Sequence, residues 1–89
     1  MMVPTIHLNG SPGERLLDEV REAGNAIDRA IHALADAAPN ARDYYPQGAD
    51  AYQAADAEHR SRLHRLVSVR DELAALSEVI ADAMAARAR

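Results

Sequence analysis

The stretch from residue 40 to residue 52 holds the side chains best suited to recognising a small molecule. All three tyrosines of the 89-residue chain, Tyr44, Tyr45 and Tyr52, fall within it. Tyrosine offers an aromatic face for stacking and a hydroxyl group for hydrogen bonding. The polar residues beside them are Asn40, Arg42, Asp43 and Gln47. An arginine fork binds carboxylate or phosphate and amides read donor and acceptor edges, so this set predicts a site for a planar, anionic ligand such as a nucleotide.

A structural role for the same residues is the alternative. Arg42 and Asp43 could satisfy the ends of helices, and the tyrosines could close the end of a helical bundle. The sequence leaves both interpretations open.

Three polar residues interrupt the apolar stripe expected for the second half of the chain. Tyr52, His59 and Arg70 project, at 100° per residue, onto the same sector as Leu63 and Leu66. Charged groups are rarely buried without a partner, so this face either borders a pocket or meets an acidic residue across an interface. We therefore add Tyr52 and His59 to the candidate ligand site as its wall. The alternative is an Arg70 that reaches solvent and a hydrogen-bonded His59 between copies.

A run of arginines in the same region is a feature that some nucleic-acid-binding proteins have. Its members are Arg60, Arg62, Arg65 and Arg70. On a helix these four point in different directions, and the acids of residues 12–38 are expected to pair with them. The net charge of −4 also argues against a general nucleic-acid binder. A DNA-binding regulator stays only as a further alternative.

Catalytic and metal-binding patterns are weak. His59 and His64 are five residues apart, which does not place them on one helical face, and the chain has no cysteine. The serines lack a nucleophile turn, and Gly10 and Gly13 do not form a phosphate-binding glycine loop. We therefore expect no enzyme, no metal and no cofactor.

The sequence predicts an all-α fold built from two long helices. Ser11, Pro12 and Glu14 are typical of a helix start, with Ser11 as the cap and Glu14 closing a capping box. Apolar residues then follow helical spacing, which predicts a first helix over about residues 12–38.

Two prolines end this helix and delimit the connection to the second. Pro39 and Pro46 predict a loop over residues 39–49, and Asp50 with Gln53 repeats the cap spacing. The second helix is expected over about residues 50–86. The short loop favours an antiparallel hairpin over residues 11–89.

Residues 1–10 form an extended N-terminal arm in this interpretation, with acceptable strand formers at Thr5–Leu8. No apolar run approaches the length of a membrane span and no secretory signal is visible, so a soluble, intracellular protein is expected.

The predicted helices are unequal, and this difference indicates self-association. Leu76, Val79, Ile80 and Met84 would overhang the first helix without a partner unless residues 3–8 fold back on them. A lone hairpin also buries little apolar area against its conformational entropy. We therefore predict a homo-oligomeric helical bundle, most simply a dimer of four helices. Its expected interface residues are Leu66, Leu73, Leu76, Ile80 and Met84.

Two segments resemble a family of small proteins encoded by tailed phages and prophages of GC-rich bacteria. They are residues 6–11, IHLNGS, and residues 40–48, NARDYYPQG, which lead into the EHRSR segment at residues 58–62. The second segment departs from the family pattern at Ala41, where glycine is expected. The resemblance implies a phage origin and the cytoplasm of the infected host, and it carries no activity.

The leading functional hypothesis is a non-enzymatic phage protein that binds a small anionic, nucleotide-like ligand. By architectural analogy it is similar to small helical phage proteins that sequester nucleotide signals of bacterial immunity. The alternative is a structural or accessory virion protein, or a protein-interaction module.

Overall fold

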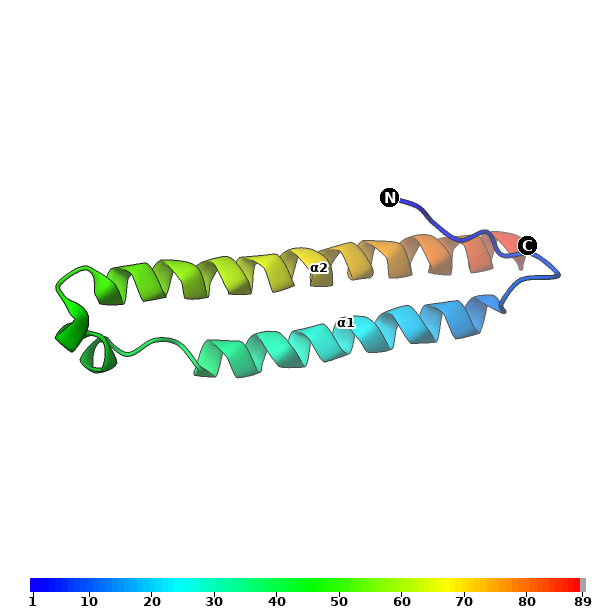
Figure 1. Ribbon diagram of the computed structural model, residues 1–89. Coiled ribbons are helices and arrows are strands. Elements are labelled where there is room, and N and C mark those ends of the chain that lie inside the picture. The colour runs from blue at the N-terminus through cyan, green and yellow to red at the C-terminus, as the bar shows by residue number, and fades with distance from the viewer. Residues whose placement is uncertain (89) are drawn as a thin grey trace.

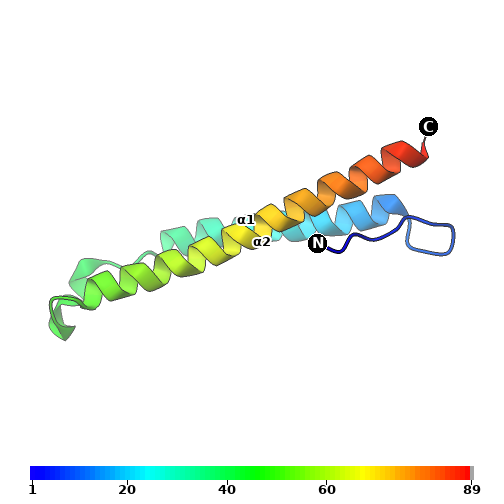
Figure 2. The ribbon, with the colours of Figure 1, turned by 90° about the horizontal axis from the view of Figure 1, so that it is seen from above.

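The computed structural model describes residues 1–88 as two long helices that pack against each other. Helix α1 spans Gly13–Asp36 and helix α2 spans Ala51–Arg87, with two short 3₁₀ helices, η1 at Ala41–Asp43 and η2 at Tyr45–Gln47, between them. The predicted all-α hairpin is confirmed, and α1 is somewhat shorter than expected (Figure 1). The molecule is a rod of 63 × 20 × 19 Å whose helices cross at a shallow angle (Figure 2).

The predicted side-chain caps are absent at both helix starts, although Asp50 occupies the predicted N-cap position of α2. Pro12, not Ser11, is the N-cap of α1, and no side chain caps this end. Pro12 serves through its backbone, since its carbonyl accepts the first helical hydrogen bond from the Leu16 N–H at 3.1 Å. Asp50 is the N-cap of α2 but makes no side-chain cap. Its φ of −96° and ψ of −5° are helical, whereas a capping side chain requires an extended backbone at that position.

The core of the hairpin is narrow. Among the described residues only Leu17 and Ile80 are buried apolar side chains, at 8% and 1% exposure. The other leucines, isoleucines and valines of the two helices are half-buried, except Val69 and Val79, which are each 40% exposed. Two helices cover each other along a single line of contact, so most of each apolar stripe keeps one side open.

The N-terminal segment runs back beside the C-terminal end of α2 (Figure 1). Residues 1–12 form neither helix nor strand, and Ile6 lies beside Gly13 and Met84. The Arg87 Nη1 donates to the Ile6 carbonyl at 2.7 Å, which ties the segment to the last turn of α2 (Figure 1). A Cβ at Gly13 would stand 2.8 Å from Met84 Cγ, so this close approach requires glycine. Gly13, the first residue of α1, lies opposite Met84, so α1 reaches this end of α2 and the predicted overhang of Leu76, Val79, Ile80 and Met84 is wrong.

The connection between the helices turns at Gly48. Its φ of 118° and ψ of 167° lie in a region that only glycine adopts readily. Among the described helices, none is long and apolar enough to cross a membrane.

Candidate functional site

A groove of about 710 Å³ runs along one side of the hairpin. It is lined by Val20, Arg21, Gly24, Asn25 and Asp28 of α1 and by Arg70, Leu73, Ala74, Ser77, Glu78, Ala81 and Asp82 of α2. Gly24 deepens the groove because it has no side chain, and an added Cβ would meet the Leu73 Cβ at 3.9 Å. The floor is apolar and both walls carry charge.

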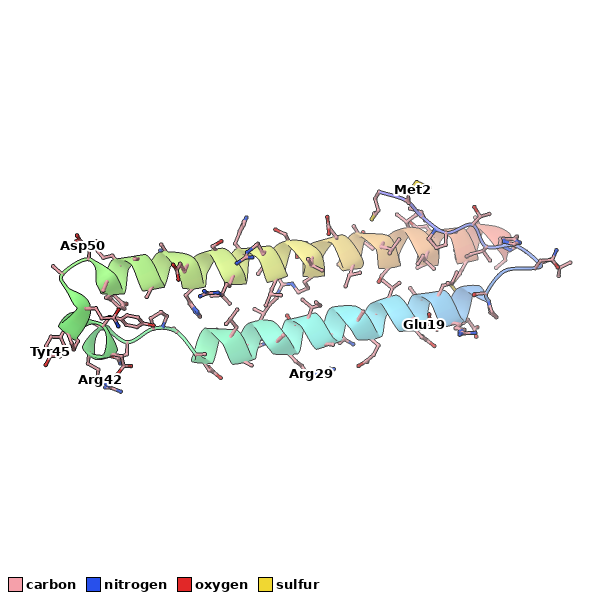
Figure 3. All side chains as sticks on the ribbon, in the orientation of Figure 1. Met2, Glu19, Arg29, Arg42, Tyr45 and Asp50 are labelled. Carbon is pink, nitrogen blue, oxygen red and sulfur yellow. The ribbon has the colours of Figure 1, made fainter. Side chains whose placement is uncertain are left out.

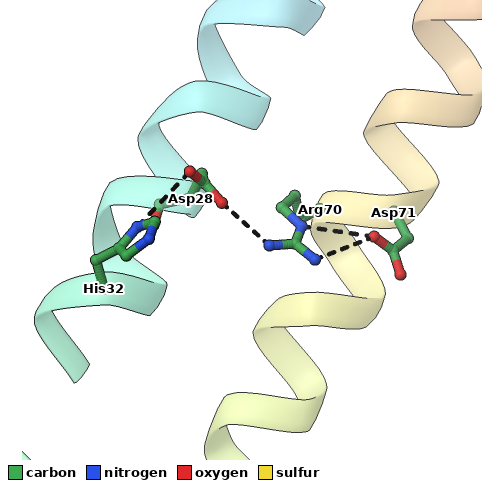
Figure 4. Close-up of polar contacts among 4 residues, drawn as sticks. All are labelled: Asp28, His32, Arg70 and Asp71. Atoms are coloured by element: carbon green, nitrogen blue, oxygen red, sulfur yellow. Dashed lines mark hydrogen bonds and ion pairs between the residues drawn. The ribbon is translucent and has the colours of Figure 1, made fainter. Parts of the chain in front are cut away.

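An ion pair joins the two helices beside the groove. Arg70 Nη1 donates to Asp28 Oδ1 at 3.0 Å, and the guanidinium also approaches Asp71 Oδ1 at 3.5 Å (Figure 4). The hydrogen bond to Asp28 raises the pKa of Arg70 above its already high ordinary value, with burial opposing it to a smaller extent. The cation therefore persists at every physiological pH.

His32 extends this network along α1. Its Nδ1 lies 2.9 Å from the backbone oxygen of Asp28 and 3.6 Å from Oδ2 of the same residue. Asp28 therefore stands between a permanent cation on one side and an imidazole on the other (Figure 4).

The remaining charges of the groove are free of ion pairs within residues 1–88. Arg21 lies on the α1 wall, and Glu78 and Asp82 lie on the α2 wall. All three side chains are exposed. The groove thus has an apolar floor between two walls that each carry charges of both signs. In the described part of the chain, no three histidine, aspartate or glutamate side chains gather where they could hold a metal ion.

The predicted ligand residues of the connection lie outside this groove. Asn40 is occupied in local structure, since its Oδ1 accepts from the Arg42 N–H at 3.0 Å and so caps η1. Tyr44 is half-buried and Tyr45 is 76% exposed. Arg42, Asp43 and Gln47 are exposed. Figure 3 shows Arg42 and Tyr45 on the outer side of the loop.

Tyr52 and His59, the predicted wall of the ligand site, differ in their surroundings. Tyr52 is 36% exposed, whereas His59 is 6% exposed and is the buried polar residue among those described. A side chain so covered cannot line an open pocket. The structure therefore gathers the connection residues at one end of the rod and leaves His59 in the helix packing.

The residues expected at an interface between copies are largely used inside the chain. Ile80 is covered within the chain, and Leu66, Leu73, Leu76 and Met84 are half-buried. Leu73 also lines the groove. Ile80 is thus not accessible to a second copy in this hairpin.

The acidic partner of Arg70 is the main feature that sequence reasoning missed. An acidic residue opposite Arg70 was expected, and the structure identifies it as Asp28. The expectation that the first helix pairs with the arginine run is wrong for Arg60 and Arg62. Their partners, Asp56 at 3.0 Å and Glu58 at 3.6 Å, lie one turn earlier on α2 itself.

Comparison of the chain with protein-family models, with curated proteins and with solved structures finds no match.

Proposed function

We propose that the chain is a non-enzymatic interaction module that works as a homo-oligomer, most simply a dimer that forms a four-helix bundle. The observation that carries this proposal is the large accessible surface. The chain exposes 6626 Å², whereas a compact monomer of 9.6 kDa exposes about 5,100 Å². A typical protein–protein interface buries about 800 Å² on each partner, so the surplus is large enough for one.

The small core supports the same proposal. Leu17 and Ile80 are the buried apolar side chains of the described residues, while Val69 and Val79 are each 40% exposed. Ordering a residue costs roughly 1–2 kcal/mol of backbone conformational entropy. A second copy that covers half-buried leucines and exposed valines would add the apolar burial that a single hairpin lacks.

Light scattering of the full-length protein tests this function. Measured across micromolar concentrations, the molar mass is expected to be a multiple of 9.6 kDa. Elution volume alone is unsuitable, because a rod of 63 Å elutes earlier than a compact monomer of its mass. A mass of one chain throughout the range would contradict the proposal.

Recognition of a small anion by the connection is a second candidate. The favouring observation is that Arg42 is exposed and makes no ion pair within the described residues, while Tyr45 presents an exposed ring beside it. A phosphate on Arg42 and a base on Tyr45 would use both. Such a protein would sequester a nucleotide signal in the host of a phage.

Calorimetry against a panel of nucleotides and cyclic nucleotides tests this second candidate. Heat that disappears in Arg42→Ala and in Tyr45→Ala supports it. Arg15→Ala is the control, because Arg15 is equally exposed but lies at the other end of the rod and pairs with Glu19. Absence of heat with every nucleotide would eliminate the candidate.

A further inference from the structure

The two sides of the hairpin differ in chemistry. The groove side carries the charges of Arg21, Asp28 and Asp82. At 100° per residue, Ala23 and Ala30 lie on the opposite side of α1 from Arg21, and both alanines are exposed. On the side away from the groove, the middle of α1 therefore presents a patch without charge around Ala23 and Ala30.

Larger apolar residues border these alanines. Ile27 and Leu34 are half-buried at the edge of α1 that meets α2, Ala26 is exposed, and Val69 of α2 is 40% exposed. We define the apolar side face as Ala23, Ala26, Ile27, Ala30, Leu34 and Val69. No member carries a charge, whereas a residue on the groove side is charged at almost every turn.

We infer that a second copy of the chain packs on the apolar side face, with the two α1 helices antiparallel about a two-fold axis. This inference rests on the proposed function and names the surface that serves it. Interface cores are depleted of charge, which favours this side over the groove. Small residues such as Ala23 and Ala30 let the axes of two helices approach closely, so that Ile27 and Leu34 reach across to the other copy.

The charges that flank the face support the antiparallel orientation. Arg29 Nη2 lies 3.2 Å from Glu22 Oε1, and both side chains are exposed. Arg29 points away from α2 at the edge of α1 (Figure 3). The midpoint of Glu22 and Arg29 lies within one residue of the midpoint of Ala23 and Ala30. A two-fold axis there places Glu22 of one copy opposite Arg29 of the other, twice, as an isologous interface requires.

The groove side stays on the outside of this dimer. The N-terminal segment covers the C-terminal end of α2, where Arg87 holds Ile6, and so leaves the middle of α1 open. The residues predicted from sequence for the interface, such as Leu73 and Ile80, instead hold each hairpin together.

Ala30→Glu and Ala74→Glu form a matched test. Both alanines are exposed and helical, but Ala30 lies in the apolar side face and Ala74 lies in the groove. In sedimentation velocity, Ala30→Glu should raise the dimer dissociation constant roughly 30-fold or more, because a charge is buried without a partner. Ala74→Glu should change it by no more than about twofold. Far-UV circular dichroism of both variants shows whether the helices persist.

Exchanging the charges of Glu22 and Arg29 tests the antiparallel orientation of the two α1 helices. Glu22→Arg leaves two arginines and Arg29→Glu leaves two acids, so each variant alone should dimerise more weakly. Mixed in equal amounts, the two variants should form a heterodimer with restored affinity. Weak dimers in the mixture as well would overturn the antiparallel arrangement.

The results of these experiments distinguish failure of the proposed interface from failure of the proposed self-association. If the wild type is a dimer that Ala74→Glu dissociates and Ala30→Glu does not, the apolar side face is not the interface and the proposed function stands. If the wild type is a monomer, both are overturned.

Discussion

Ile80 is the most completely covered apolar side chain of the described residues, at 1% exposure. It lies one turn before Met84, which lies opposite Gly13 at the start of α1, so Ile80 is within the contact between the two helices. His59 is the other covered residue of α2, at 6% exposure. The stability of the hairpin is therefore concentrated in few positions.

Shortening the Ile80 side chain should lower the free energy of unfolding much more than shortening the side chain of its neighbour, Val79. Ile80→Ala is expected to lower the free energy of unfolding by about 2–5 kcal/mol, since it leaves a cavity at the best-covered site. Val79→Ala is the control, because Val79 is 40% exposed, and its cost should stay below about 1 kcal/mol. Urea unfolding at one fixed protein concentration measures both. Equal losses would mean that Ile80 is not a core residue.

Replacing Gly48 or Gly24 by alanine should change the stability of the protein in opposite directions. Gly48→Ala should destabilise by about 1–3 kcal/mol, because its φ of 118° suits glycine. Gly24→Ala should stabilise by about 0.5–1 kcal/mol, because the position is helical and a Cβ there makes an ordinary 3.9 Å contact with Leu73. Thermal unfolding at matched concentration compares them. A stabilised Gly48→Ala would refute the turn geometry.

Sequence reasoning identified the charge at Arg70 as unusual but could not locate its partner. Helical periodicity assigns a residue to a sector, and Asp28 falls at the edge of the apolar sector of α1. Whether an edge residue contacts the other helix depends on the crossing angle and on the missing side chain at Gly24, neither of which periodicity gives. The groove was missed for the same reason.

The N-terminal segment behaves as a structural element although it has no regular secondary structure. Ile6 is half-buried beside Gly13 and Met84, whereas Leu8, two residues on, is 93% exposed. These two residues provide a matched pair of substitutions.

Substitution of Ile6 by a charged residue should release the N-terminal segment from α2, whereas the same substitution of Leu8 should not. Ile6→Asp should detach the segment, lower the melting temperature by several degrees and expose Met84, because a charge cannot replace the apolar contact. Hydrogen exchange should then accelerate in the last turns of α2, up to Arg87. Leu8→Asp should leave exchange unchanged. Equal protection in both variants would show that the segment does not stabilise this end.

The two long helices were predictable because strong local signals agree. Pro39 and Pro46 stop helices, and the regular apolar spacing of α1 is that of a half-buried helix. The side-chain caps were not, because Ser11 lies one residue before the N-cap Pro12, and Asp50 is the N-cap of α2 but has a helical backbone. Composition predicts which residues can cap, and the path of the chain decides which do.

At the scale of the whole molecule, the rod is too extended for its mass. Its radius of gyration is 19.3 Å, whereas a compact domain of 89 residues has about 12 Å. Elongation and a narrow core have one cause, since two helices side by side bury only their line of contact. A second copy on the apolar side face would thicken the rod and cover the open side of each stripe.

The most direct test of this account is the thermal unfolding midpoint as a function of protein concentration. If a second copy completes the core, folding and association are linked and the midpoint rises with each tenfold increase in concentration. The account predicts this rise for the wild type and a lower midpoint for Ala30→Glu at the same concentration. A midpoint that stays constant over a thousandfold range of concentration would contradict it.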